Sequence, residues 1–469
     1  MKIEQIYTGC LAQGAYYIES NGEAAIIDPL REVQQYIDKA AADNATIKYI
    51  FETHFHADFV SGHITLSEKT DAPIVYGPTA QPAFKAHIAT DGEEFKIGNA
   101  TIIALHTPGH TMESTTYLLR DENGKDHAIF SGDTLFLGDV GRPDLAQKAA
   151  HMTQEELAAT LFHSLRTKIM PLEDEVIVYP AHGAGSACGK NLSKETVGTL
   201  GEQKRTNYAL RADMTIEEFV KEVTDGLLPP PVYFPENVRL NKEGYQNVET
   251  IIKNNQAFTP AEFKQAADEA LILDVRDANS FGKAHIPGAV FIGIDGGFAP
   301  WVGALITDIN QPIILVTPDG REEETITRLS RVGYDNTLGY LKGGIQSWMD
   351  AGFETDSIQR ITATELETLM NGGEDSVIDV RKPGEYESAH LENVPNLPLD
   401  FINEHIADFP SQKTTYLHCA GGYRSMIAAS ILKARGFHNM IDVIGGFGQI
   451  KNTSLPIVSE ECEDRCIAK

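Results

Sequence analysis

The sequence predicts an α/β protein in which an N-terminal sandwich is followed by two smaller α/β domains that resemble each other. Two observations support this prediction. In the first half, short apolar strands alternate with helical segments, and several of these strands are followed by a histidine or an aspartate. In the second half, the segment Leu271–Arg276 recurs as Ser376–Arg381, which indicates a duplicated domain.

The N-terminal half begins with a hairpin and continues with strands and helices in alternation. Ala15–Glu19 and Ala24–Asp28 flank the turn sequence Ser20-Asn21-Gly22-Glu23, which is typical of a β-hairpin. The elements expected next are a helix over 33–43, a strand at Ile47–Phe51, a helix at Ile64–Lys69, and strands at Ile74–Tyr76 and Thr101–Leu105. This alternation favours an α/β sandwich.

Four apolar strands are each followed by potential metal ligands. The strand Ile47–Phe51 leads into a loop that presents His54, His56 and Asp58. The other three strands lead to His110, Asp133 and His182, respectively. Two imidazoles and a carboxylate at such short spacing suit a metal site. Scattered histidines would not follow strands in this way, so we expect one metal centre.

This set of residues resembles the metallo-β-lactamase superfamily over about the first 250 residues. The resemblance implies an αββα sandwich with metals at the sheet edge. The common motif His-x-His-x-Asp-His ends here in Phe59, which cannot ligate, so the dinuclear zinc site of hydrolytic members such as glyoxalase II is expected to be broken. The retained His54, His110 and Asp133 match the facial triad of non-haem Fe(II) oxygenases. Within the superfamily this set looks like the persulfide dioxygenases.

The same resemblance suggests roles for the neighbouring residues. His56, Asp58 and His182 are expected to orient bound water or substrate rather than ligate the metal. Arg142 is expected to hold the anionic end of the thiol cofactor, with a plain surface salt bridge as the alternative. Cys188 is either a buried small hydrophobe or a thiol near the metal that exchanges sulfur with the substrate.

The duplicated segments resemble rhodanese domains across about residues 257–465. Besides the repeated strand, each copy has a histidine segment and a paired glycine; these are Ala284–Pro287 with Gly343-Gly344, and Ala389–Glu392 with Gly445-Gly446. The expected division is a metallo-β-lactamase-like domain with a connector over 1–250, an inactive rhodanese-like domain over 257–356, and an active one over 358–469. The aspartate and arginine of each repeated segment are expected to brace a loop.

Only the second copy has the residues for sulfur transfer. The strand Thr415–His418 leads into Cys419-Ala420-Gly421-Gly422-Tyr423-Arg424-Ser425 and then a helix. Backbone N–H groups of such a loop, with Gly421 and Gly422 at its centre, stabilise a thiolate or a persulfide. Arg424 adds a positive charge over the same pocket. Cys419 is therefore expected to be the sulfur-accepting nucleophile.

The first copy and the remaining cysteines give weaker signals. The matching stretch Leu315–Glu324 contains no cysteine and places three glutamates at a helix start, so this domain is predicted to be catalytically inactive. Cys462 and Cys466 are either a redox pair or half of a metal site, or they belong to a frayed, reduced tail. Cys10 is expected to be a packing residue.

Composition limits the classes of partner and compartment. The chain has 469 residues, enough for two to four domains, and a net charge of −28 that argues against nucleic acid or an anionic membrane as the main partner. Neither a signal peptide nor a transmembrane run is expected. Five cysteines do not make a disulfide framework, which favours a cytoplasmic location. A symmetric homo-oligomer is expected only because such assemblies are common among soluble proteins.

The resemblances together imply a non-haem Fe(II) persulfide dioxygenase with one mononuclear iron site, fused to a rhodanese sulfurtransferase acting through Cys419. Expected partners are O2, sulfite, thiosulfate and a thiol persulfide of glutathione, coenzyme A, bacillithiol or a similar carrier, as in sulfide detoxification. Two alternatives remain open. One is a zinc-dependent thioesterase of the glyoxalase II type with an appended sulfurtransferase, and the other is a non-catalytic persulfide sensor that uses Cys419 and Cys188.

Overall fold

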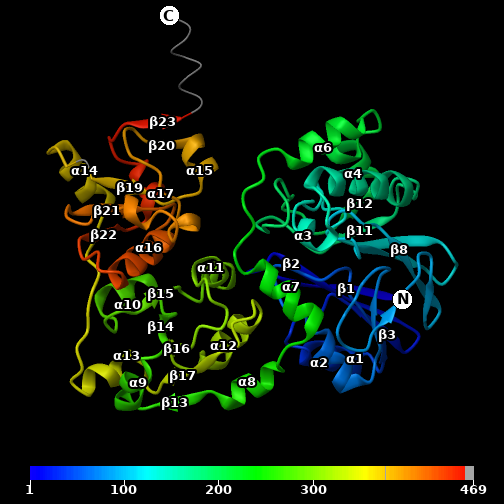
Figure 1. The fold of residues 1–469 in the computed structure, drawn as a ribbon, viewed down its shortest axis with the longest axis horizontal. Helices are drawn as coiled ribbons and strands as arrows, with labels where there is room; N and C mark the ends of the chain where they lie inside the picture. Colours follow the sequence, from blue (N-terminus) through cyan, green and yellow to red (C-terminus); the bar gives the residue numbers. More distant parts are fainter. Residues whose placement is uncertain (375, 460–469) are drawn as a thin grey trace, which may run out of the picture. The chain divides into compact units, whose positions relative to one another are not determined.

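The computed structural model describes residues 1–374 and 376–459, so Cys462 and Cys466 lie outside the described residues. The chain forms two compact units, one of residues 1–250 with the segment 329–333, and the other of residues 251–328 with the chain from Tyr334 onward. Figure 1 colours the first unit from blue to green and the second from green to red.

The first unit contains two six-stranded sheets. The first sheet has the order β1-β2-β3-β4-β5-β6, with β1 Lys2–Thr8, β2 Gln13–Ser20, β3 Glu23–Ile27, β4 Thr46–Phe51, β5 Ile74–Tyr76 and β6 His87–Ile88. The second has the order β12-β11-β10-β9-β8-β7, with β7 Glu94–Ile97, β8 Ala100–His106, β9 Thr115–Arg120, β10 Asp126–Gly132, β11 Ile177–Pro180 and β12 Gly198–Thr199.

The predicted hairpin near the N-terminus is confirmed. Strands β2 and β3 pair antiparallel, and the turn residues Asn21 and Gly22 have φ values of 49° and 79°. Two consecutive positive φ angles are what a tight hairpin turn requires, and asparagine and glycine are the residues that adopt them at least cost. From β3 onward the first sheet continues with parallel pairs through β4, β5 and β6.

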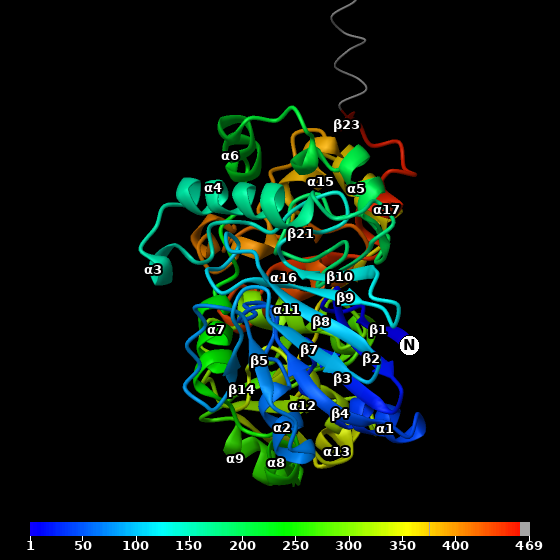
Figure 2. The ribbon, with the colours of Figure 1, turned by 90° about the vertical axis from the view of Figure 1, so that its right-hand side faces the viewer.

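Helices cover the outer face of each sheet, which gives four layers (Figure 2). The inner faces bury aromatic side chains against each other, among them Phe51 from β4 and Phe130 from β10. Helices α1 Gln34–Ala42 and α2 His63–Thr70 pack on the first sheet, and α4 Gln154–Ser164 and α6 Ile216–Thr224 pack on the second. The predicted αββα sandwich is confirmed.

Further helices complete this half of the chain, namely α3 Gln147–Ala150, the π-helix η1 Leu165–Ile169, α5 Leu200–Thr206, the 3-10 helix η2 Tyr208–Leu210, α7 Phe234–Glu243 and α8 Val248–Asn254. Local sequence explains the helix starts on the second sheet. In α4, the Thr153 side chain accepts from the backbone of Glu156, and the Glu156 carboxylate accepts from the backbone of Thr153. The same reciprocal cap opens α6.

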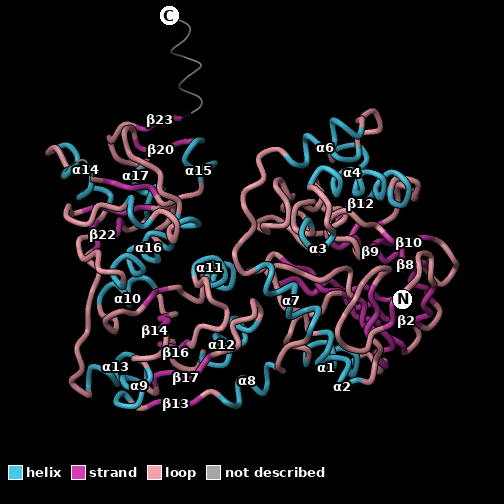
Figure 3. The backbone as a smooth tube through the Cα atoms, in the orientation of Figure 1, coloured by secondary structure: helices cyan, strands magenta, loops and turns pink. Residues whose placement is uncertain are grey.

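The second unit contains two parallel sheets and a short antiparallel pair of strands (Figure 3). The five-stranded sheet has the order β13-β17-β16-β14-β15, with β13 Gln256–Phe258, β14 Leu271–Asp274, β15 Val290–Phe291, β16 Ile313–Val316 and β17 Thr337–Leu341. The four-stranded sheet has the order β18-β22-β21-β19, with β18 Arg360–Ile361, β19 Val377–Asp379, β21 Thr415–His418 and β22 Met440–Val443. Strands β20 Ala389–Leu391 and β23 Ile457–Ser459 pair antiparallel.

Helices alternate with these strands, as in other parallel α/β folds. The first domain of this unit has α9 Pro260–Ala266, α10 Ala278–Lys283, α11 Phe298–Leu305, α12 Glu322–Ser330 and α13 Gly344–Asp350. The second has α14 Ala363–Asn371, α15 Pro383–Ser388, the 3-10 helices η3 Leu399–Phe401 and η4 Ile406–Asp408, α16 Tyr423–Ala434 and α17 Gly446–Ile450.

The duplicated segments adopt the same bracing arrangement in both domains. Arg276 pairs with Asp274 and donates to the carbonyl of Ala284 at 2.8 Å. In the second copy Arg381 pairs with Asp379 and donates to the carbonyl of Ala389, also at 2.8 Å. Each arginine therefore ties a strand end to the loop that follows the next helix. Within the described part of the chain, no helix is both long and apolar enough to cross a membrane.

Candidate active sites

The predicted metal ligands converge at one edge of the sandwich. The Nε2 atoms of His54 and His110 lie 3.9 Å and 3.4 Å from Oδ2 of Asp133, and all three side chains are buried. Neither oxygen of the Asp133 carboxylate accepts a hydrogen bond within the described chain. A buried carboxylate without a partner is costly, and a cation bound by the two imidazoles and this carboxylate would remove that cost. These residues fit a mononuclear metal site.

Neighbouring groups hold the two imidazoles in place. His110 Nδ1 lies 2.8 Å from the backbone carbonyl of Arg142, and His54 Nδ1 lies 3.0 Å from Oγ1 of Thr53. Thr53 is fixed in turn by Asp28, which accepts from both its backbone and its hydroxyl at 2.8 Å. Burial and the neighbouring histidines lower the pKa of His54 well below its usual value. The imidazole is therefore neutral, which is the form that binds metals.

His56, Asp58 and His182 form a second buried group of potential ligands. His182 Nε2 lies 3.5 Å from both Asp58 Oδ2 and Asp133 Oδ1, so this group adjoins the first. His56 Nε2 faces Asp28 Oδ1 at 3.1 Å. Burial lowers the pKa of His56, but the carboxylates around it, Asp28 foremost, more than compensate and raise it to about 9. The predicted orienting roles of these three residues stay predictions.

Phe59 occupies the position where the superfamily motif has its last histidine. Its side chain is fully buried, and the phenyl ring lies 4.3 Å from the imidazole of His56. The ring therefore packs in the metal loop without offering a ligand atom.

Asn241 of α7 is a site residue that the sequence did not reveal. Its side-chain amide donates to the carbonyls of His56 and Phe59 and accepts from the backbone of Ser61, each at 2.8 Å. One buried side chain thus satisfies three backbone groups of the metal loop. Because α7 lies far away in the sequence, within the stretch we expected to be a connector, only the folded structure reveals this contact.

Cys188 lies beside the candidate metal ligands. Its sulfur is buried and groups with ligand atoms of Asp133 and His182, all within 4.8 Å of one another. Burial, with further contributions from the nearby carboxylates of Asp58 and Asp133, raises its pKa well above the usual value. Cys188 is thus both buried and close to the candidate metal ligands, so the two alternatives open from the sequence stay predictions.

Arg142 is buried and its guanidinium has several partners within the protein. Nε and Nη2 donate to the two carboxylate oxygens of Asp144, both at 2.7 Å. Nη2 and Nη1 also donate to the carbonyls of Leu228 and Ala187, at 2.6 Å and 3.2 Å. An anionic substrate group would have to displace one of these partners or use the remaining N–H. The predicted substrate-binding role of Arg142 therefore stays a prediction.

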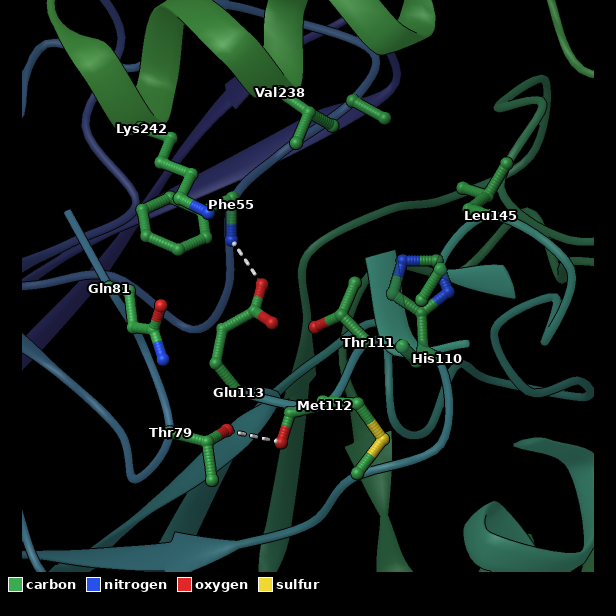
Figure 4. A pocket seen from close by; sticks show the side chains of 13 residues that line it. Phe55, Thr79, Gln81, His110, Thr111, Met112, Glu113, Leu145, Val238 and Lys242 are labelled. Atoms are coloured by element: carbon green, nitrogen blue, oxygen red, sulfur yellow. Dashed lines mark hydrogen bonds between the residues drawn. The ribbon is translucent and has the colours of Figure 1, made fainter. Parts of the chain in front are cut away.

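A pocket of about 220 Å³ opens next to His110 (Figure 4). Figure 4 shows Glu113 near its centre, with one carboxylate oxygen accepting from the backbone N–H of Phe55 at 3.1 Å. Its lining residues are Phe55, Ala57, Thr79, Gln81, His110, Thr111, Met112, Glu113, Leu145, Ala146, Ala150, Val238 and Lys242. Thr79 has φ 70°, a strained conformation for a β-branched residue. The pocket places a mixed polar and apolar surface beside a candidate metal ligand.

The sulfur of Cys419 lies in the loop that opens α16. It accepts a hydrogen bond from the backbone N–H of Gly422 at 3.1 Å, and Oγ of Ser425 lies at 3.5 Å. Gly422 has φ 95°, a left-handed conformation that glycine adopts without strain. The N–H of Gly422 is thus directed at the thiol, which suits the expected stabilisation of a thiolate. Gly421, the other predicted contact, has no neighbour within 4 Å of an added Cβ.

Two further features fix this loop. Arg424 forms a two-pronged ion pair with Glu385 at 2.5 and 2.8 Å. The paired glycines at the start of α17 pack against the loop, because a Cβ on Gly446 would lie 2.1 Å from the carbonyl oxygen of Cys419. In the first copy, Thr317 follows β16 where Cys419 follows β21, and among the described residues no cysteine lies in that domain.

The fold and these sites define a metal-binding αββα protein with a duplicated domain behind it. Residues 8–182 match the family model described as the metallo-beta-lactamase superfamily. Residues 259–351 and 362–453 each match the model of the rhodanese-like domain. The chain belongs to the metallo-beta-lactamase superfamily and carries two rhodanese-like domains.

Two curated relatives with different activities each match about half of the chain, and a solved structure matches more of it. A probable hydroxyacylglutathione hydrolase of Schizosaccharomyces pombe is 34% identical over 48% of this chain and 91% of its own length. The mitochondrial persulfide dioxygenase ETHE1 of Homo sapiens is 30% identical over 45% of this chain and 74% of its own. A crystal structure of a metallo-beta-lactamase from Staphylococcus aureus subsp. aureus COL is 30% identical over 73% of this chain and 98% of its own, with a TM-score of 0.64.

Proposed function

We propose that the first domain is an Fe(II)-dependent persulfide dioxygenase and that the last domain transfers sulfur through Cys419. The observation that carries the first part is the buried group of His54, His110 and Asp133, with Phe59 in place of a further ligand. Two histidines and one carboxylate with open positions are typical of non-haem iron oxygenases. The similarity to the human persulfide dioxygenase supports the same activity.

Iron(II) held by these residues would supply the chemistry by which O2 oxidises the terminal sulfur of a persulfide. The balanced reaction converts a persulfide RSSH, O2 and water into the thiol RSH, sulfite and two protons. The side chains around the metal site would bind the thiol persulfide and hold it in position for this reaction. The pocket beside His110 would accept the thiol carrier, with Lys242 and Glu113 as its charged contacts. Asn241 and Asp28 keep the metal loop and its imidazoles in position.

The rhodanese-like domain with Cys419 would couple this oxidation to sulfur transfer. The thiolate of Cys419, stabilised by the Gly422 N–H, would take the outer sulfur from a donor such as thiosulfate, releasing sulfite and leaving a persulfide on Cys419. The reverse reaction consumes sulfite and forms thiosulfate. Either direction would place the protein in sulfide detoxification.

Oxygen uptake tests the first part of this proposal. Iron-loaded protein is given persulfides of glutathione, coenzyme A and bacillithiol, and sulfite is quantified alongside O2 consumption. We expect sulfite in proportion to O2, with one carrier preferred, and loss of uptake in Asp133→Ala. An Asp133→Ala variant with full oxygen uptake would exclude the iron assignment.

A zinc-dependent thioesterase is the second candidate, favoured by the similarity to the hydroxyacylglutathione hydrolase. It predicts bound zinc and hydrolysis of a hydroxyacylglutathione thioester. Metal analysis of the protein as purified separates the two candidates, since the dioxygenase requires one iron per chain. Two zinc ions per chain, reduced to one in Cys188→Ser, would instead show that the group of Asp133, His182 and Cys188 binds a second metal.

A further inference from the structure

The inactive rhodanese-like domain contacts the active loop at the residue that follows Gly422. Tyr423, the first residue of α16, is half-buried, and its hydroxyl donates to the carbonyl of Gly293 at 2.7 Å. The ring of Phe291 meets the Tyr423 ring edge-on, with centroids 6.0 Å apart. Both partners belong to the inactive domain, at the end of β15 and in the loop after it.

Gly296 of this loop fits so closely against the Tyr423 ring that a larger residue at this position would displace the ring. A Cβ built on Gly296 would lie 2.3 Å from Cζ of Tyr423, with two more ring carbons at 2.6 and 2.7 Å. The neighbouring Gly297 has no such contact, since its Cβ would meet only Trp301 at 3.4 Å. Gly293 and Gly296 of this loop therefore form a close-fitting contact surface for the Tyr423 ring, which we call the cradle.

A second chain of contacts connects the inactive domain to the sulfur. Ser425 Oγ, 3.5 Å from the sulfur of Cys419, donates to Oδ1 of the buried Asp442 at 2.6 Å. Arg360 Nε donates to the other oxygen of Asp442 at 2.8 Å. The same guanidinium also donates to the side chain of Asn279, which lies in the first turn of α10 in the inactive domain. Tyr423 is thus anchored directly to the inactive domain, whereas Ser425 is connected to it through Asp442 and Arg360.

These contacts bear on the geometry around the thiol. The N–H of Gly422 is the backbone donor to the Cys419 sulfur, and Gly422 is bonded directly to Tyr423. A displacement of Tyr423 would also shift Gly422, and with it the N–H that is directed at the sulfur. Because the angle of a hydrogen bond controls its strength, anchoring Tyr423 preserves the stabilisation of a thiolate.

We propose that the inactive rhodanese-like domain positions the Cys419 loop, with Tyr423 as a positioning residue held in the cradle of Gly293 and Gly296. An effect of this domain on the rate of sulfur transfer rests on the proposed function. Its effect on the ionisation of the Cys419 thiol does not depend on that function.

The pair Gly296→Ala and Gly297→Ala in the full chain tests this proposal. Alkylation of Cys419 by iodoacetamide is followed as a function of pH, and mass spectrometry of the Cys419 peptide separates this thiol from the others. In Gly296→Ala the added methyl group displaces the Tyr423 ring. We therefore expect the pH midpoint of Cys419 alkylation to rise by about one unit, which corresponds to about a tenfold loss of the thiolate at neutral pH. Gly297→Ala should match the unmodified protein.

Tyrosine variants provide an independent test should Gly296→Ala fail to fold. Tyr423→Phe removes only the hydroxyl that donates to Gly293, and we expect a smaller shift in the same direction. Tyr334→Phe is the matched control, because its buried hydroxyl also donates to a carbonyl, that of Ile306, but entirely within the inactive domain. Transfer of sulfur from thiosulfate to cyanide is measured in parallel and should fall with the thiolate fraction.

Unchanged alkylation profiles in both Gly296→Ala and Tyr423→Phe would overturn the proposal. The proposal would also be overturned if the alkylation midpoint shifted equally in the test variants and in their controls. Equal shifts would indicate a general destabilisation of the domain and not a specific effect on the Tyr423 contacts. Cys419 of the unmodified protein could be alkylated normally while the protein transfers no sulfur. This result would contradict the proposed function, and the comparison of alkylation profiles would still test the positioning role of Tyr423.

Discussion

Asp133 combines complete burial with two carboxylate oxygens that accept no hydrogen bond among the described residues. A carboxylate in that condition destabilises the metal-free protein, and a bound cation reverses the effect. Single residues of this kind link the stability of the sandwich to its metal content.

Asp133→Asn should therefore have opposite effects on the stability of the metal-free and the metal-bound protein. Without metal, the neutral amide removes the buried charge, so we expect a free energy of unfolding equal to or higher than that of the unmodified protein. With Fe(II) added anaerobically, the unmodified protein should gain stability and the variant should not. Thermal unfolding with and without the metal measures both effects. An equal gain from Fe(II) in both proteins would contradict the assignment of Asp133 as a ligand.

Asn241→Ala should destabilise the first domain by about 3 kcal/mol, because it leaves three buried backbone groups of the metal loop without partners. It should also weaken metal binding. Asn237→Ala is the matched control: Asn237 is buried one turn earlier on α7, and its side-chain amide makes no hydrogen bond to any described residue. Urea unfolding and metal titration compare the two, and equal losses would show that only packing of α7 matters.

The sequence revealed the residues with the most specific chemistry and missed those that support them. His54, His110 and Asp133 could be predicted because each follows an apolar strand, and strand ends meet at one edge of a sheet. Asn241 carries no such signal, since an asparagine inside a helical segment is ordinary unless its long-range backbone partners are known. The pocket residue Glu113 is equally inconspicuous in sequence.

At the scale of elements, the loop between β21 and α16 depends on its neighbours. Glu385 on α15 holds Arg424 by a two-pronged ion pair, and α17 approaches the loop through its paired glycines. The ion pair is only half-buried, so its contribution to stability is below about 1 kcal/mol.

Glu385→Gln should show a pH-dependent loss of stability. The hydrogen-bonded Arg424 lowers the pKa of Glu385 in the folded protein. Its stabilisation is therefore complete above the unfolded pKa of about 4.3 and disappears as the pH falls through the lower folded value. We expect the variant to be less stable than the unmodified protein at neutral pH and equally stable in acid. Urea unfolding at both pH values measures this, and exposed Glu387 on the same helix provides the control. A difference that persisted in acid would contradict the ion-pair explanation.

Most elements of the first half could be predicted from the sequence because their patterns are local. The hairpin followed from Asn21-Gly22, and β5 has the predicted bounds Ile74–Tyr76. The stretch 227–235 is rich in proline, a composition that favours a stiff, extended backbone. Its last two residues, Phe234 and Pro235, instead begin α7, because proline is well tolerated in the first turn of a helix.

At the scale of the whole molecule, the two compact units have separate hydrophobic clusters. Each unit contains its own candidate site, the metal ligands in the first unit and Cys419 in the second. The duplicated domains were recognisable from the sequence because Asp-Val-Arg recurs, but the support that one copy gives the other depends on contacts between segments far apart in the chain.

The two proposed activities should therefore separate. Cys419→Ser should abolish sulfur transfer from thiosulfate and leave oxygen uptake with a thiol persulfide unchanged. Asp133→Ala should do the reverse. Both assays on both variants, with the unmodified protein alongside, give the result. Loss of both activities in either variant would show that the sites are obligatorily coupled.

Helix α7 supports the metal loop through Asn241 and also lines the pocket through Val238 and Lys242. Val238, Asn241 and Lys242 lie within about one turn of this helix, so the lining of the pocket and the support of the metal loop share one stretch of backbone. A substitution of Val238 or Lys242 that moves this backbone would also disturb the contacts of Asn241. A designer who wishes to retarget the enzyme should randomise Val238 and Lys242 and hold Asn241 constant.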